Sequence, residues 1–106
     1  MPKYLFEVSY TTEGAKGLLK EGGSKRRAMV EKTLGGLGAK VEALYYALGK
    51  YDVYLIADAP DNVTVAAISL AISAAGGAKI KTTVLMTTQE IDAAAKKTVD
   101  YRPPGK

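Results

Sequence analysis

A short repeat constrains the fold of this chain more than any other feature. The tetrapeptides GAKV at residues 38–41 and GAKI at residues 77–80 each follow a stretch of helical periodicity with a glycine pair near its end, and each enters a strand-like segment. The chain is therefore expected to contain two similar β-α-β units. With right-handed crossovers, two such units form a four-stranded antiparallel sheet with both main helices on one face, in a βαββαβ order.

Four segments have the pattern of strands. Residues 3–10 and 39–48 alternate along their length, as half-buried strands do. Residues 51–58 are almost wholly apolar, which is typical of a central strand covered on both sides, and residues 79–87 are the fourth strand. A tight glycine turn is expected to join the second and third strands into a hairpin.

Two helical regions connect these strands. The first is interrupted by Gly22 and Gly23. Because a glycine pair inside a helix costs roughly 2 kcal/mol relative to alanines, and Ser24 is a good N-cap, we predict two helical pieces joined at a bend. The second helix, about residues 63–75, is apolar nearly all round, which predicts that it is deeply packed.

The C-terminal region is expected to add one more helix. Residues 87–90 offer a capping box for a helix that runs through about residue 99. The proline pair that follows is incompatible with a helix, so residues 101–106 are expected to be an extended tail. We therefore predict one α+β domain over residues 1–100, followed by this tail.

One face of the predicted sheet has no helix to cover it, yet it keeps large apolar side chains. The side chains assigned to this open face are Leu5, Leu44, Tyr46, Leu48 and Leu85, with Tyr54 and Ile56 as further candidates. An exposed patch of this kind usually marks an interface. A second copy that packs sheet on sheet is the simplest cover, so the sequence predicts a homodimer or higher oligomer.

Two absences restrict the chemistry that the chain can perform. Without cysteine there is no disulfide, thiolate nucleophile or iron–sulfur cluster. Without histidine there is no Ser-His-Asp triad and no histidine-ligated haem. The residues predict no metal site and no cofactor, and they leave any catalytic residue unknown.

The charge is too small to indicate nucleic acid as a partner. The chain has 15 basic and 11 acidic residues, a net charge of +4. RNA-binding domains share this order of elements, but Glu7 and Glu42 lie on the face where bases would stack. The chain has neither a signal-peptide pattern nor an apolar stretch long enough to span a bilayer, so we expect a cytoplasmic protein with no membrane role.

Most of the basic surplus lies in one segment, residues 16–27. At the glycine bend, free backbone N–H groups, the Ser24 hydroxyl and Arg26 lie at a helix start, where anions are favoured. Lys16 and Lys20 share a helix face with this bend. The alternative is a plain glycine bend with solvated cations paired to nearby glutamates.

A second candidate site lies around the predicted hairpin. Tyr51 and Asp52 follow the turn and place a carboxylate beside a phenol, which suits ligand orientation or weak base catalysis. The alternative is hairpin chemistry, in which Asp52 bonds to the backbone. Tyr10 is a further candidate to line a pocket, although tyrosines on strands more often serve packing.

These residues resemble the GYD domain family, whose Gly-x-Tyr-Asp signature stands here at residues 49–52. Further matching blocks are Tyr10-Thr11 with Glu13-Gly14, Gly22-Gly23-Ser24 with Arg26, Gly35-Gly36 and Pro60-Asp61. The resemblance covers nearly the whole chain. It implies a ferredoxin-like fold of the dimeric α+β barrel type, and it brings no established activity with it.

Three functions fit this sequence. We expect a homo-oligomeric binder of a small, anionic metabolite, held between helix and sheet. The alternatives are a cofactor-independent oxygenase or isomerase, which the wider superfamily includes and which needs an acid or base in the pocket, and a structural assembly module without a ligand. The candidate ligand-binding residues are Tyr10, Lys16, Lys20, Ser24, Arg26, Tyr51 and Asp52.

Overall fold

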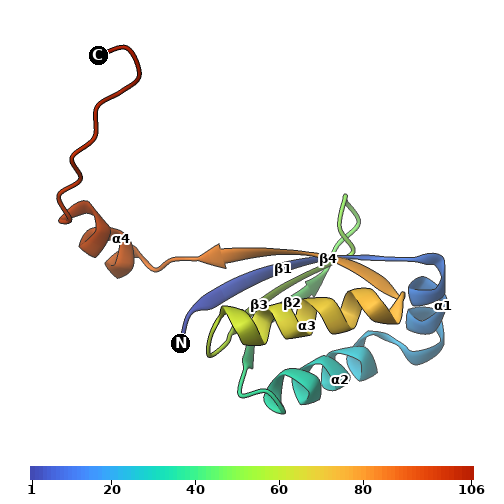
Figure 1. The fold of residues 1–106 in the computed structure, drawn as a ribbon. Coiled ribbons are helices and arrows are strands. Elements are labelled where there is room, and N and C mark those ends of the chain that lie inside the picture. The colour runs from blue at the N-terminus through green and yellow to red at the C-terminus, as the bar shows by residue number, and fades with distance from the viewer.

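The structure, a computed structural model, describes all 106 residues. The elements are β1 (Lys3–Tyr10), α1 (Thr12–Glu21), α2 (Gly23–Gly35), β2 (Lys40–Tyr46), β3 (Val53–Asp58), α3 (Asn62–Ala75), β4 (Ala78–Leu85) and α4 (Thr88–Ala95). This order confirms the predicted βαββαβ plan, with the first helix divided in two and one helix added at the C-terminus (Figure 1).

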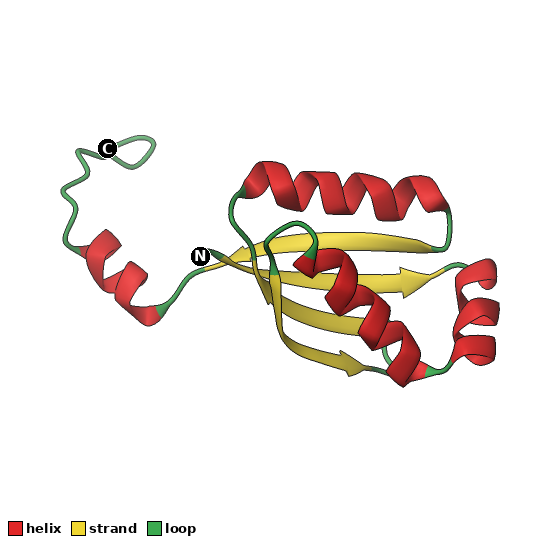
Figure 2. Cartoon of the chain, turned by 90° about the horizontal axis from the view of Figure 1, so that it is seen from below, coloured by secondary structure: helices red, strands yellow, loops and turns green.

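The four strands form one antiparallel sheet in the order β2-β3-β1-β4. Helices α2 and α3 cover the same face of this sheet, and α1 lies at one end of it (Figures 1 and 2). This is the α+β, ferredoxin-like fold predicted from the repeat. Strand β3 is central, as predicted, but helices cover only one of its faces, so the prediction of cover on both sides is wrong for the single chain.

A β-bulge in β2 reverses the predicted faces of that strand. Val41 pairs with Ala57 and Ala43 pairs with Ile56, so Glu42 is an extra residue in the ladder. Beyond the bulge, Leu44 lies on the helix-covered face and only 6% of it is exposed. Tyr46, two residues further along β2, lies on the same covered face and lines the cavity described below. The prediction that Leu44 and Tyr46 belong to the open face is therefore wrong.

The core lies between the sheet and the two covering helices. Its fully enclosed members are Tyr4 and Phe6 of β1, and Leu34, Val65 and Ile68 join them from α2 and α3. The Tyr4 hydroxyl donates a hydrogen bond of 2.6 Å to the Asn62 side chain, so the phenol is satisfied at the edge of the core.

The predicted bend between α1 and α2 is confirmed at Gly22, whose φ of +85° favours glycine. The predicted cap at Ser24 is wrong, because α2 already begins at Gly23 and has no side-chain cap. Helix α3, in contrast, has a side-chain N-cap, because the Asp61 carboxylate accepts a hydrogen bond of 2.8 Å from the Thr64 amide.

Helix α3 is less deeply packed than its sequence predicts. It buries Val65 and Ile68 against the sheet, but Val63 is 79% exposed and Leu70 is 71% exposed. Nothing in the chain covers its outer surface, because the fold has only two layers.

The C-terminal helix is shorter than predicted and stands away from the body (Figure 1). The radius of gyration is 17.0 Å, whereas a compact domain of this length has about 13 Å. No helix in the structure combines the length and the apolar character needed to cross a membrane.

Candidate functional site

A cavity of about 110 Å³ lies between the sheet, α2 and α3. Sixteen residues line it and 14 of them are hydrophobic. They are Phe6, Val8, Tyr10, Arg26, Met29, Val30, Thr33, Leu34, Leu44, Tyr46, Val53, Leu55, Ile68, Ile72, Ala78 and Ile80. An apolar cavity with a few polar groups is the usual form of a small-molecule site.

Strand alternation supplies the floor of this cavity. Phe6, Val8 and Tyr10 are two residues apart in β1, so their side chains point to the same face. The register places Ile80 of β4 beside Val8 and Ala78 beside Tyr10, which continues the floor across the sheet.

Helical spacing supplies the roof. In α2, Arg26, Val30 and Thr33 are separated by four and three residues, so they lie on one side of the helix. In α3, Ile68 and Ile72 are four residues apart and both line the cavity. Arg26 is the only charged residue among the lining side chains.

Tyr10 lies where the cavity meets two neighbouring surface hollows. One hollow is lined by Glu21 and other residues of α1 and α3, and it shares Arg26 with the cavity. The lining of the other hollow includes Asp52 and Leu48, and this hollow shares Tyr46 with the cavity. The cavity therefore opens to the surface around Tyr10.

Burial raises the pKa of the Tyr10 phenol above its ordinary value. The neighbouring Tyr46 raises this pKa further, and the positive charge of Arg26 opposes the shift. At neutral pH the phenol therefore keeps its proton, and it is a hydrogen-bond donor beside the arginine.

Tyr46 connects this mouth to the start of α2. Its hydroxyl donates a hydrogen bond of 3.1 Å to the Gly23 carbonyl. A Cβ atom at residue 23 would lie 3.2 Å from the Tyr46 ring, so a larger residue there would require the ring to shift by a few tenths of an ångström. The hydrogen bond holds the first turn of α2, and with it Arg26, above the sheet.

A second close approach holds α1 in place. A Cβ atom at Gly14 would clash directly with the Gly77 carbonyl oxygen, so only glycine fits. The Thr11 amide donates a hydrogen bond of 3.0 Å to the same carbonyl. The start of α1 is therefore fixed against the turn that precedes β4.

The carboxylate of Asp52 is engaged by the backbone. It accepts a hydrogen bond of 2.7 Å from the Tyr10 amide, and the Asp52 amide donates one of 2.8 Å to the Val8 carbonyl. Asp52 thus fixes the end of β1 and positions Tyr10, as the hairpin alternative anticipated. Tyr51 packs edge-on against Tyr54, with the two ring centroids 6.1 Å apart, and it does not line the cavity.

The predicted basic cluster does not converge on one point. Lys16, Lys20 and Ser24 are exposed, and none of them lines the cavity or either hollow. Arg27 forms an ion pair of 3.5 Å with Glu31 on the outside of α2. Of the basic candidates, only Arg26 reaches the cavity.

Sequence reasoning did not select several residues that shape this site. Met29, Val30 and Thr33 follow Arg26 at helical spacing, and that spacing is the signal that identifies them. Tyr46 carries no such signal, because its face depends on the bulge in β2. The chain contains no group of three acidic side chains arranged as metal ligands.

Fold and cavity together define a ferredoxin-like α+β domain with a small pocket between its helices and its sheet. A family model described as GYD domain matches residues 4–95, from the first strand to the end of α4, and the chain therefore belongs to the GYD domain family. Neither the comparison with curated proteins nor the comparison with solved structures gave a match.

Proposed function

We propose that this GYD domain protein binds a small molecule that has an apolar body and one anionic group. The observation that carries the proposal is Arg26. It is the one charged residue lining an otherwise apolar cavity, and none of the ion pairs in the structure includes it. An arginine in this position is free to bind a carboxylate or a similar anion.

The volume of the cavity limits the size of the ligand. The cavity measures about 110 Å³, and an apolar cavity of about 150 Å³ is known to hold benzene. A phenyl ring or a branched alkyl chain is therefore the largest apolar body that fits with little adjustment. Further atoms of the ligand would extend into the hollow beside Arg26.

The mouth of the cavity supplies the polar contacts that such a ligand needs. Arg26 provides a charged donor, and the protonated Tyr10 phenol provides a neutral one. Because Arg26 is exposed, solvent screens a charge pair that it forms, and such a pair contributes roughly 0.2–1 kcal/mol. One such contact should therefore favour an acid over its neutral analogue by up to about fivefold in affinity.

The same features favour binding over acid–base catalysis. No aspartate, glutamate or lysine lines the cavity. The raised pKa of Tyr10 keeps its proton in place, which makes it a poor general base. Asp52 is already held by the backbone of β1.

We also propose that the protein is a homo-oligomer, formed through the open face of the sheet. Leu5, Tyr54, Ile56 and Leu85 share this face by register and leave apolar surface on it. The charged residues of the face are four lysines and three acidic residues: Lys3, Lys40, Lys79, Lys81, Glu7, Glu42 and Asp58. Because the two signs nearly balance, two copies can approach face to face with little net repulsion.

The binding proposal is tested by calorimetric titration with benzoate and its neutral analogue benzamide. We expect saturable binding of benzoate, and binding of benzamide that is about two- to fivefold weaker. Arg26→Met should remove the preference for the acid. Arg27→Met is the matched control, because Arg27 pairs with Glu31 outside the cavity, and it should bind like the parent protein. Equal affinity for the two compounds, or no binding of either, would contradict the proposal.

A further inference from the structure

The C-terminal arm, defined here as residues 86–106, makes no hydrogen bond with the rest of the chain. Every residue from 88 onward is exposed. The hydrogen bonds that the arm does make, such as Ile91 to Thr87 and Lys106 to Pro103, all lie within it. It is the one folded part of the molecule that is not packed on the body.

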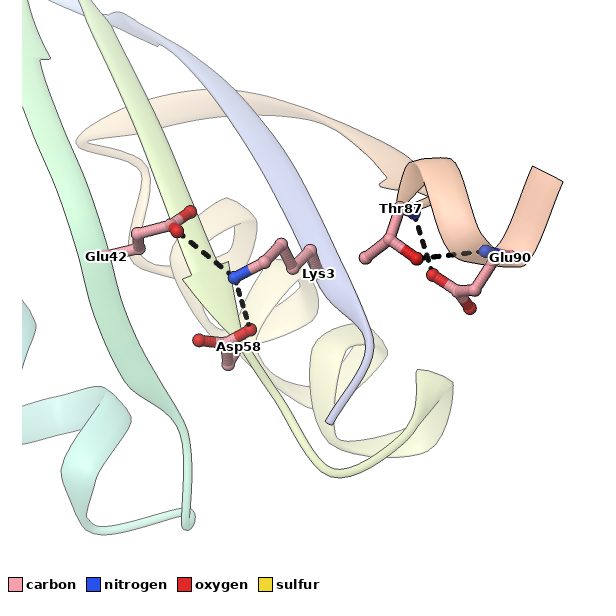
Figure 3. Close-up of polar contacts among 5 residues, drawn as sticks. All are labelled: Lys3, Glu42, Asp58, Thr87 and Glu90. Atoms are coloured by element: carbon pink, nitrogen blue, oxygen red, sulfur yellow. Dashed lines mark hydrogen bonds and ion pairs between the residues drawn. The ribbon is translucent and has the colours of Figure 1, made fainter. Parts of the chain in front are cut away.

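The arm nevertheless contains a well-defined helix start. The Thr87 hydroxyl accepts a hydrogen bond of 3.1 Å from the Glu90 amide, and the Glu90 carboxylate accepts one of 2.8 Å from the Thr87 amide (Figure 3). A helix of only eight residues is marginal in water even with good capping. Helix α4 therefore needs a surface to pack against.

Helix α4 has a side suited to such packing. Ile91, Ala94 and Ala95 are three and four residues apart, so they lie on the same side of the helix. Ile91 is 53% exposed, and beyond the helix Val99 is 77% exposed and Tyr101 is 68% exposed. These apolar side chains have no partner within the chain.

The arm leaves the body beside the open face. Leu85, the last residue of β4, pairs with Lys3, whose ammonium group binds Asp58 and Glu42 on that face (Figure 3). In Figure 1 the helices α2 and α3 lie below the sheet, whereas the tail after α4 rises above it. Figure 2 places the arm beyond the end of the sheet, not beneath it.

We propose that the arm is exchanged between two copies of the chain, with the apolar side of each α4 packed against the partner that covers the open face. This inference rests on the proposed homo-oligomer and adds a second contact between the two copies, beside the one through the open face. A copy on the open face lies on the side toward which the tail turns. The arm carries Glu90, Asp92 and Asp100 together with Lys96, Lys97, Arg102 and Lys106, so it lacks the strong positive charge of a membrane-binding segment.

The first test compares dimer dissociation by sedimentation equilibrium over a dilution series. Ile91→Glu places a charge on the apolar side of α4 and should raise the dissociation constant at least about tenfold. Gln89→Glu adds the same charge to the polar side of the same helix, and it should stay within about twofold of the parent. An unchanged dissociation constant in Ile91→Glu would overturn the arm exchange, even if the sheet-to-sheet dimer is real. A parent protein that is monomeric throughout would overturn both.

The second test follows amide hydrogen exchange of α4. We expect its amides to be protected at high protein concentration and to lose protection on dilution, or when Ile56→Glu disrupts the open face. Protection that is independent of concentration would mean that the arm folds onto its own body. Protection that appears only with vesicles containing anionic lipid would assign the arm to membranes. Either result overturns the exchange and leaves the ligand site untouched.

Discussion

The covered face and the open face of the sheet are built from alternate residues of the same strands, but they differ in what accompanies their apolar side chains. On the covered face, Tyr4 and Phe6 are almost wholly enclosed. On the open face, Leu5 lies between Lys3 and Glu7 and is only half-buried. The covered face excludes water within a single chain, whereas the open face mixes apolar with charged side chains and remains accessible to water.

The two faces also differ in how their charged groups are paired. At one end of the open face three charged groups are paired, since the Lys3 ammonium lies 3.0 Å from Asp58 and 3.2 Å from Glu42 (Figure 3). The covered face has Arg26 at its cavity, and none of the ion pairs includes this charge. Three charged groups at one end of the open face therefore satisfy one another, whereas Arg26 forms no ion pair.

The largest expected difference between the faces is in stability. Phe6→Ala should lower the free energy of unfolding by about 3–5 kcal/mol, because it leaves a void in the core. Leu5→Ala, one residue earlier on the open face, should cost about 1 kcal/mol or less in the monomer. Urea denaturation at low protein concentration measures both variants. Similar losses at the two positions would contradict the assignment of the faces.

The next largest effect separates assembly from ligand binding. Ile56→Glu places a charge at the centre of the open face and should shift the protein to a monomer. Benzoate affinity should change by less than about twofold, because Ile56 does not line the cavity. Light scattering and titration calorimetry on the same sample give the two results. A large loss of benzoate affinity would show that the faces are not independent.

A smaller effect appears at alkaline pH. The pKa of Tyr10 is higher in the folded protein than its ordinary value of 10.0, mainly because the phenol is buried. Its contribution to stability is complete below that ordinary pKa and is lost as the pH rises through the folded-state value. Tyr10→Phe should therefore lose less stability than the parent between neutral and strongly alkaline pH. Parallel losses in the two proteins would contradict a buried Tyr10.

The smallest effect concerns the helix that covers the cavity. The Thr64 backbone amide lowers the pKa of Asp61, the N-cap of α3. This contribution is present above the ordinary pKa of 3.8 and is lost as the pH falls through the lower folded-state value. Asp61→Ala should slightly lower the melting temperature at neutral pH and leave the dimer dissociation constant unchanged. Thermal unfolding at pH 7 and in acid tests this, and an equal deficit at both pH values would contradict the cap.

Much of the fold was readable from local signals in the sequence. The repeated tetrapeptides predicted the order of elements. The bend at Gly22 and the capping box at Thr87 were also predicted at the positions where the structure has them. The faces of β2 were not predictable. One additional residue, Glu42, reverses the alternation after it, and nothing in the composition of the strand marks a bulge.

The candidate site was only partly predictable for a related reason. The basic segment pointed to Arg26, but helix rotation decides which of its cations meets the sheet, and five cations in 12 residues do not reveal that rotation. The sequence also led to an overestimate of how much of α3 is buried. An apolar helix predicts burial, yet burial requires a second surface, and this chain provides only one.

The central claim is that the covered face holds a small acid while the open face holds a second copy. The five isoleucines of the chain report on each surface: Ile68, Ile72 and Ile80 line the cavity, Ile56 lies on the open face and Ile91 lies in the arm. The most direct measurement is a methyl NMR spectrum of protein labelled only at isoleucine. Addition of benzoate should shift the signals of residues 68, 72 and 80 alone, and dilution should shift those of residues 56 and 91 alone. Benzoate shifts confined to Ile56 or Ile91, or no shift at the three cavity isoleucines, would contradict the account.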